Sequence, residues 1–150
     1  MIDLMETVKF QAEYAYCIDS DELERWPDFF TADGLYRITN VLNEKRGMPI
    51  GIVHAAGQPM MRDRITSLRK ANVFEAQRYR HLMSQPRLLG NGRTITGFMV
   101  VRIMHDGTTD LFATGEYHDV ITEDAGELKF SERVVILDSE RVDTLLAIPV

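Results

Sequence analysis

The stretch that decides the fold runs from Thr94 to Leu137 and reads TITGFMVVRIMHDGTTDLFATGEYHDVITEDAGELKFSERVVIL. Over much of its length the pattern of side chains repeats every two residues, which is typical of β-strands. His105-Asp106-Gly107 and Glu123-Asp124-Ala125-Gly126 interrupt the pattern, and both are suited to hairpin turns. The same period begins earlier, at Tyr79. The pattern therefore predicts four successive antiparallel strands, over residues 79–86, 94–105, 110–122 and 128–137.

Both faces of these strands are largely apolar. In the 94–105 strand, Phe98 and Val100 point to one face, and Met99 and Val101 point to the other. The run Val134-Val135-Ile136-Leu137 has no polar side at all. A sheet of this kind has to be covered on both sides. Helices can cover one side, and the other must be covered by the curling sheet itself or by a partner chain.

Helices are predicted in the N-terminal half. Asp3 and Glu6 form a capping-box pattern that opens a first helix. Its predicted core face is Leu4, Val8, Ala12, Ala15 and Ile18, flanked by Tyr14 and Cys17. A second, short helix is expected from Leu23 to about Trp26, because Pro27 is poorly tolerated further inside a helix. A third begins at Pro59 and ends near Asn72, and two further strands are predicted over 35–41, after a turn at Asp33-Gly34, and 50–56, with a polar loop over 43–49 between them.

Helices followed by an antiparallel meander predict an α+β fold. We expect N-terminal helices packed on a curved antiparallel sheet, which together form a cone-shaped roll with a pocket inside. No repeat, low-complexity tract or linker divides the sequence, so residues 1–150 are expected to form a single domain. This architecture serves enzymes and scaffolds alike, and the function therefore has to be argued from the site.

Composition narrows the function. The chain has 150 residues and a formal net charge of −6, yet residues 62–93 carry eight basic and only two acidic residues. Without a nucleic-acid motif, this basic segment favours a solvated face or a docking surface for an acidic protein over a nucleic-acid site. There is no basic and apolar N-terminal signal and no apolar run of about 20 residues, so a cytoplasmic protein without a membrane segment is expected.

No catalytic, cofactor-binding or metal-binding residue is predicted. His54, His81, His105 and His118 show no helical ligand spacing, and a Rieske centre needs two cysteines where the chain has only Cys17. Gly90-Asn91-Gly92 precedes a strand, so it is predicted to be a loop rather than a phosphate cradle. Charged residues do occur within the strands. Glu116 is predicted to pair with Arg102 or Arg133 across the ladder.

Several segments, in order, resemble the small (β) subunits of Rieske-type aromatic-ring-hydroxylating dioxygenases over essentially the full length. They are Asp19-Ser20-Asp21 through Trp26-Pro27-Asp28-Phe29-Phe30, Arg78-Tyr79-Arg80-His81, Phe98-Met99-Val100-Val101-Arg102, Gly115-Glu116-Tyr117 and the ending from Arg141 to Pro149. Within that family the likeness is greatest to subunits that serve aromatic carboxylates, with terephthalate first and anthranilate and benzoate next.

The resemblance implies a cystatin-like roll, related to nuclear transport factor 2, scytalone dehydratase and ketosteroid isomerase. It implies a non-catalytic subunit for aromatic catabolism, in a hetero-hexamer of three large (α) and three small chains. The Rieske [2Fe-2S] cluster and the mononuclear Fe(II) are expected on the large subunit, and no cofactor is expected in this chain. Trp26, Arg78, Tyr79 and Arg80 are the predicted subunit interface, because Trp, Tyr and Arg dominate binding hot spots. For Trp26, a local plug over the second helix is the alternative.

A second hypothesis is a stand-alone dehydratase or isomerase in the same roll. Its acid and base groups would be Tyr14, Tyr36, His81 and Glu116, inside the cone. That hypothesis requires an open cavity of roughly a few hundred Å³ lined by these groups. A cone filled with apolar side chains would exclude it.

Overall fold

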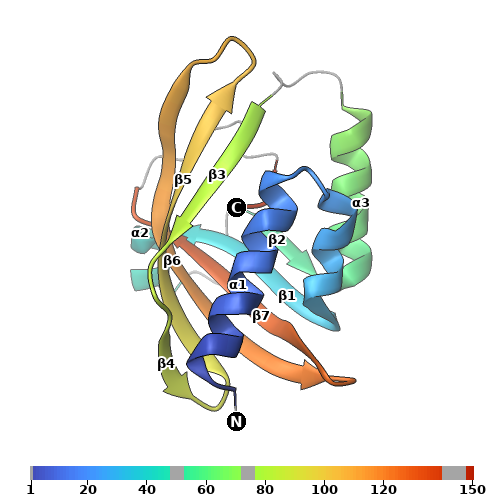
Figure 1. The fold of residues 1–150 in the computed structure, drawn as a ribbon, viewed down its shortest axis with the longest axis vertical. Helices are drawn as coiled ribbons and strands as arrows, with labels where there is room; N and C mark the ends of the chain where they lie inside the picture. Colours follow the sequence, from blue (N-terminus) through green and yellow to red (C-terminus); the bar gives the residue numbers. More distant parts are fainter. Residues whose placement is uncertain (1, 48–52, 72–76, 140–147) are drawn as a thin grey trace.

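A computed structural model describes residues 2–47, 53–71, 77–139 and 148–150. It shows a curved sheet with its two longest helices on one side of it (Figure 1). In chain order the elements are α1 (Leu4–Asp19), the 3-10 helix η1 (Leu23–Phe29), β1 (Phe30–Asn40), α2 (Val41–Lys45), β2 (Val53–Ala56), α3 (Gln58–Lys70), β3 (Gln77–Met83), β4 (Arg87–Gly90), β5 (Arg93–Met104), β6 (Thr109–Asp124) and β7 (Glu127–Leu137). The predicted α+β roll is confirmed.

The predicted meander is confirmed as β3, β5, β6 and β7, each antiparallel to the next. The first of these strands ends at Met83, before the predicted limit of Pro86, and an unpredicted short strand, β4, follows it. The predicted loop at Gly90-Asn91-Gly92 is the turn between β4 and β5. Asn91 and Gly92 have φ values of 56° and 76°, as the two central residues of a type I′ hairpin turn require.

The sheet is mixed, which corrects the expectation of a wholly antiparallel sheet. Its strand order is β2-β1-β7-β6-β5-β3, with β4 beside β5, and β1 runs parallel to β7. Insertion of β1 gives the apolar end of β7 a neighbour on each side, as its continuous hydrophobic run requires. The predicted turn at Asp33-Gly34 instead lies inside β1, at an irregularity in its pairing with β7. A side chain at Gly34 would come within 3.0 Å of the Phe130 carbonyl oxygen, so glycine permits this close approach.

The first helix begins as predicted but faces the sheet differently. The backbone N–H of Glu6 donates to Asp3 Oδ1 over 2.8 Å, which completes the capping box together with the bond from the Asp3 N–H to Glu6. Of the predicted core face, Ala15 and Ile18 are buried, with the flanking Tyr14 and Cys17, whereas Leu4, Val8 and Ala12 are exposed. Two polar residues, Thr7 and Gln11, are buried in their place. The helix is therefore rotated so that Gln11 points at charged groups inside the roll.

The other predicted helices also shift at their ends. The 3-10 helix η1 continues through Pro27 to Phe29, because a proline ring holds the φ that such a turn needs and costs it only one N–H donor. The third helix starts at Gln58, with Pro59 in its first turn, and the predicted end near Asn72 lies outside the described residues. Residues 50–52 of the predicted 50–56 strand also lie outside them, and the rest forms β2. The start of the predicted polar loop over 43–49 belongs to the short helix α2.

Candidate functional site

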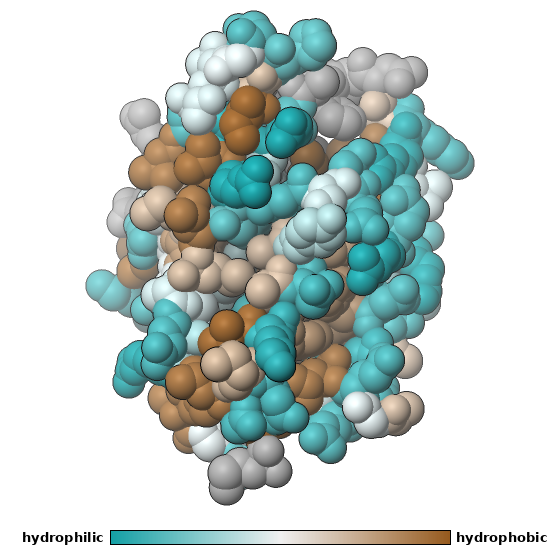
Figure 2. All heavy atoms as spheres, in the orientation of Figure 1, coloured by the Kyte–Doolittle hydropathy of each residue, from teal (hydrophilic) through white to brown (hydrophobic). Residues whose placement is uncertain are grey.

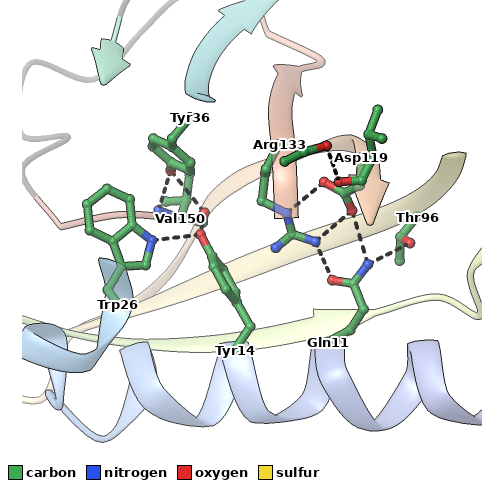
Figure 3. Close-up of polar contacts among 10 residues, drawn as sticks. Gln11, Tyr14, Trp26, Tyr36, Thr96, Asp119, Arg133 and Val150 are labelled. Carbon is green, nitrogen blue, oxygen red and sulfur yellow. Dashed lines mark hydrogen bonds and ion pairs between the residues drawn. The ribbon is translucent and has the colours of Figure 1, made fainter. Parts of the chain in front are cut away.

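A buried ion pair occupies the inside of the roll. Arg133 of β7 lies directly opposite Asp119 of β6 in the sheet, and both side chains are fully buried. The guanidinium donates from Nε to Asp119 Oδ1 and from Nη2 to Asp119 Oδ2, each over 2.8 Å. Gln11 of α1 completes the cluster, since its Nε2 donates to Asp119 Oδ2 over 3.1 Å and its Oε1 accepts from Arg133 Nη2. Figure 3 shows these side chains converging from the helix and the two strands.

Aromatic rings surround the guanidinium. Its central carbon lies 3.8 Å from the ring centroid of Tyr117, 4.2 Å from that of Phe130 and 4.4 Å from that of Tyr14. Burial opposes the charged form of Arg133, but the charge and hydrogen bonds of Asp119 outweigh it and hold the pKa of Arg133 above its ordinary value. Cation–π contacts of this kind are strongest where water is excluded. The cluster therefore fixes α1 to the sheet from inside the roll.

A second set of polar contacts closes the roll at the C-terminal residue. The Trp26 indole Nε1 donates to the Tyr14 hydroxyl over 3.0 Å, and the Tyr36 hydroxyl donates to the Val150 carbonyl over 3.1 Å (Figure 3). Burial raises the pKa of Tyr14 to about 12, although the nearby Arg133 charge lowers it. Burial also raises the pKa of Tyr36 well above its ordinary value. Both phenols thus stay protonated near neutral pH and serve as structural hydrogen-bonding groups.

His81 and Glu116, the other groups of the dehydratase hypothesis, lie elsewhere. The His81 imidazole is buried with its Nδ1 2.6 Å from Asp19 Oδ1, and the His81 backbone N–H donates to Asp19 Oδ2 over 2.9 Å. This pair ties the end of α1 to β3. Glu116 lies on the exposed side of β6 and contacts His118 Nε2 at 3.1 Å. The four residues therefore do not converge on one site.

The grooves of the described surface lie apart from the two tyrosines. One of about 580 Å³ lies between α1, η1 and the start of β7, and one of about 670 Å³ lies between α1 and β3. A smaller groove of about 190 Å³ lies on the sheet near Arg93 and His118. Neither Tyr14 nor Tyr36 lines any of these three grooves. Around both tyrosines the roll is packed with aromatic rings and does not present them to a substrate.

The predicted charge pairing was wrong. Arg102 binds Asp110 over 3.0 Å, and Arg133 binds Asp119, so Glu116 pairs with neither arginine. Glu116 lies directly opposite Ile136 in the pairing of β6 with β7, so these two side chains share a face of the sheet. Arg133 is an odd number of residues from Ile136 along β7, so its side chain points to the other face.

Metal-ligating side chains are scattered over the described part of the chain. Within residues 2–47, 53–71, 77–139 and 148–150, no group of three or more His, Cys, Asp or Glu side chains could hold a metal ion. Cys17 is buried, and its thiol donates to the Glu22 carbonyl over 3.0 Å. This donor set does not fit a Rieske cluster or a two-histidine iron site. No helix among these residues is long and apolar enough to cross a membrane.

The predicted interface residues fall into two groups. Arg78 and Arg80 are exposed on β3, whereas Tyr79 is buried against Phe112 with their rings stacked 5.2 Å apart. Trp26 is fully buried and packs edge-on against Phe30 and Tyr36. This position fits the alternative given for Trp26, a local plug over the second helix. Of the four predicted interface residues, Arg78 and Arg80 are therefore the two that are exposed enough to contact another chain directly. That role stays a prediction.

Sequence reasoning missed Gln11 and Asp119, which hold Arg133. Alternation along β6 puts Asp119 on the face opposite His118, and the Asp119 side chain is buried there. A signal for Gln11 was its position at i−3 from Tyr14, on the same side of α1.

Comparison with known proteins agrees with the fold. A model of the SnoaL-like domain family matches residues 3–134. The chain is 46% identical to terephthalate 1,2-dioxygenase, terminal oxygenase component subunit beta 1, of Comamonas sp, over 99% of each chain. It is 38% identical to the anthranilate 1,2-dioxygenase small subunit of Burkholderia cepacia, over 97% of this chain and 92% of that protein. A crystal structure from Novosphingobium aromaticivorans, described as the β subunit of an aromatic-ring-hydroxylating dioxygenase, superposes with a TM-score of 0.87, at 30% identity, over 98% of this chain and 96% of that one.

Proposed function

Because this chain belongs to the small subunits of aromatic-ring-hydroxylating dioxygenases, which share the SnoaL-like domain, we propose that it is the structural, non-catalytic subunit of such an oxygenase. The observation that carries the proposal is the interior of the roll, where Arg133, Asp119 and Gln11 bind one another and aromatic rings surround them. Groups that bind one another in this way stabilise the fold and are not presented to a substrate. The stand-alone dehydratase or isomerase is correspondingly disfavoured.

The chemistry is assigned to a large subunit. The described residues of this chain lack the donor set for a Rieske [2Fe-2S] cluster or a mononuclear iron, so both groups belong on that partner in this proposal. We further propose that the chain folds as one domain and that three copies join three large subunits in a cytoplasmic hexamer. The family likeness supports this arrangement.

An aromatic carboxylate is the proposed substrate of the assembly. The relative at 46% identity is named for terephthalate and the one at 38% for anthranilate. Both names denote aromatic rings that carry a carboxylate, and terephthalate is the first choice because its relative is the more similar. The substrate pocket lies on the large subunit in this proposal.

Co-expression tests the function. We expect this chain and the large subunit to purify as one complex that oxygenates terephthalate when a reductase supplies electrons. The isolated small subunit is expected to bind no stoichiometric iron and to show no turnover under the same conditions. Turnover by the isolated chain, or failure of the two chains to associate, would contradict the proposal.

A further inference from the structure

Beside Glu6, Lys9 and Glu13, an apolar stripe runs along the exposed side of α1, where a solvated helix is normally polar. Leu4, Met5, Val8 and Tyr16 have exposed fractions of 36%, 60%, 37% and 61%. Ala12 lies between Val8 and Tyr16 at helical spacing and is exposed as well. Figure 2 shows apolar atoms gathered around the N-terminal half of this helix. Contiguous exposed apolar surface of this kind is typical of a site that another molecule covers.

This apolar side borders a groove. The groove of about 670 Å³ between α1 and β3 is lined on the helix side by Ala12, Ala15 and Tyr16, and on the strand side by Arg78, Arg80 and Met83. The strand is the last in the sheet order, so no strand formed by the described residues lies along its outer edge. The Asp19–His81 pair holds helix and strand together at the same groove. The surface is therefore a pre-formed cleft between two elements that are fixed relative to each other.

Two arginines of the groove have no carboxylate partner among the described residues. Its two carboxylates already have partners inside the chain, since Asp19 binds His81 and Asp21 binds Arg69 Nη1 over 2.9 Å. Arg78 and Arg80 are exposed and form no ion pair with another described residue. A molecule that complements this groove presents carboxylates beside apolar side chains, because arginine binds carboxylates through two parallel hydrogen bonds.

We infer that the groove between α1 and β3, with the apolar side of α1, is the docking surface for the large subunit, which contacts it with carboxylates that flank apolar side chains. This inference rests on the proposed function, which supplies the partner. A second copy of this chain related by a two-fold axis is a poorer occupant, because such an interface sets the same patch against itself. Arg78 and Arg80 of the two copies would then face each other, and like charges across an interface oppose association.

Two double variants test the surface in the complex with the large subunit. Met5→Ser with Tyr16→Ser removes apolar contact, and Arg78→Glu with Arg80→Glu reverses the charge. Each is expected to weaken association with a tagged large subunit by about tenfold or more, as truncation of hot-spot residues does. The charge variant should also make association less sensitive to salt. All four side chains are exposed, so the circular dichroism and melting temperature of the isolated chain should not change.

Matched controls lie on other strands. Leu111→Ser removes an apolar side chain that is 59% exposed on β6, and Arg87→Glu reverses an exposed arginine on β4. Both should bind the large subunit with the wild-type affinity. Unchanged affinity of the two groove variants, or an equal loss in the controls, would overturn the docking surface.

Two further outcomes distinguish failure of the docking surface from failure of the proposed function. If the groove variants lower self-association of the isolated small subunit in sedimentation velocity but bind the large subunit normally, the occupant is a second copy and the inference is wrong. If the wild-type chain itself does not bind the large subunit, the proposed function fails first, and the docking surface fails with it.

Discussion

Removal of one member of the buried ion pair should destabilise the chain far more than removal of both. In Asp119→Leu, the Arg133 guanidinium stays buried among three rings and loses both of its carboxylate hydrogen bonds. Stranding one charge of a buried pair typically costs about 3–5 kcal/mol. For a chain of this length that corresponds to a fall in the melting temperature of roughly 6–20 °C. Arg133→Met should cost a similar amount, because Asp119 is only 3% exposed and keeps Gln11 as its one partner among the described residues.

The double variant Asp119→Leu/Arg133→Met should recover most of that loss. Apolar side chains of similar volume in place of a buried ion pair are often neutral or stabilising. A residual cost of about 1–3 kcal/mol is expected from Gln11, whose buried amide then keeps one contact with the described residues, the 3.4 Å contact with Thr96. Adding Gln11→Leu should remove that residual cost.

Urea unfolding of the isolated chain, followed through the fluorescence of its single tryptophan, Trp26, measures these free energies. Comparison is valid where the denaturant slope stays the same among the variants. A loss in the free energy of unfolding below about 1 kcal/mol in Asp119→Leu would refute the structural role of this ion pair. A buried charge left without its partner destabilises a protein by more than that. A double variant that loses the sum of the two single variants would refute the pairing itself.

The remaining predictions concern single buried positions. Burial raises the pKa of the Cys17 thiol to about 11, so a thiol reagent at pH 8 should leave the native chain unmodified. The same reagent should label Cys17 in the denatured chain. Rapid labelling of the native chain would contradict the burial of this thiol. Burial raises the pKa of Tyr14 to about 12 in the folded chain, against about 10 when unfolded, so the unfolded state loses this proton first. The free energy of unfolding should therefore fall between pH 10 and 12, by up to about 1.4 kcal/mol per pH unit for this group, and Tyr14→Phe should show a smaller slope in urea titrations at pH 9, 10 and 11. In Gly115→Ala the new Cβ would lie 2.2 Å from the Ile136 carbonyl oxygen, so β6 and β7 must separate locally. We expect a loss of about 1–3 kcal/mol in thermal unfolding, and an unchanged melting temperature would show that the two strands are less closely packed there.

Local patterns in the sequence were sufficient for the type of most elements. The two-residue period from Tyr79 to Leu137 predicts the long strands, and the Asp3–Glu6 pattern predicts where α1 begins. The family likeness also came from the order of short segments along the chain. These features depend on residues close in sequence, so no knowledge of distant contacts was needed.

Tertiary structure decided which residues meet. A register shift between Val120 and Ile121 places Asp119 directly opposite Arg133, and an uninterrupted hairpin register would have set Glu132 there. The parallel insertion of β1 beside β7 joins segments about a hundred residues apart, and no periodic pattern identifies such a neighbour.

The orientation of α1 shows the same limit. Its apolar residues alone predicted a core face that included Leu4 and Val8, yet the buried charges on the sheet require Gln11 to face inward. The sequence by itself determined that this segment is a helix with apolar residues to cover, because helical spacing is a local property. Only the tertiary structure decided that several of them face outward, because the desolvation of Asp119 and Arg133 has to be compensated by hydrogen bonds from the helix above them.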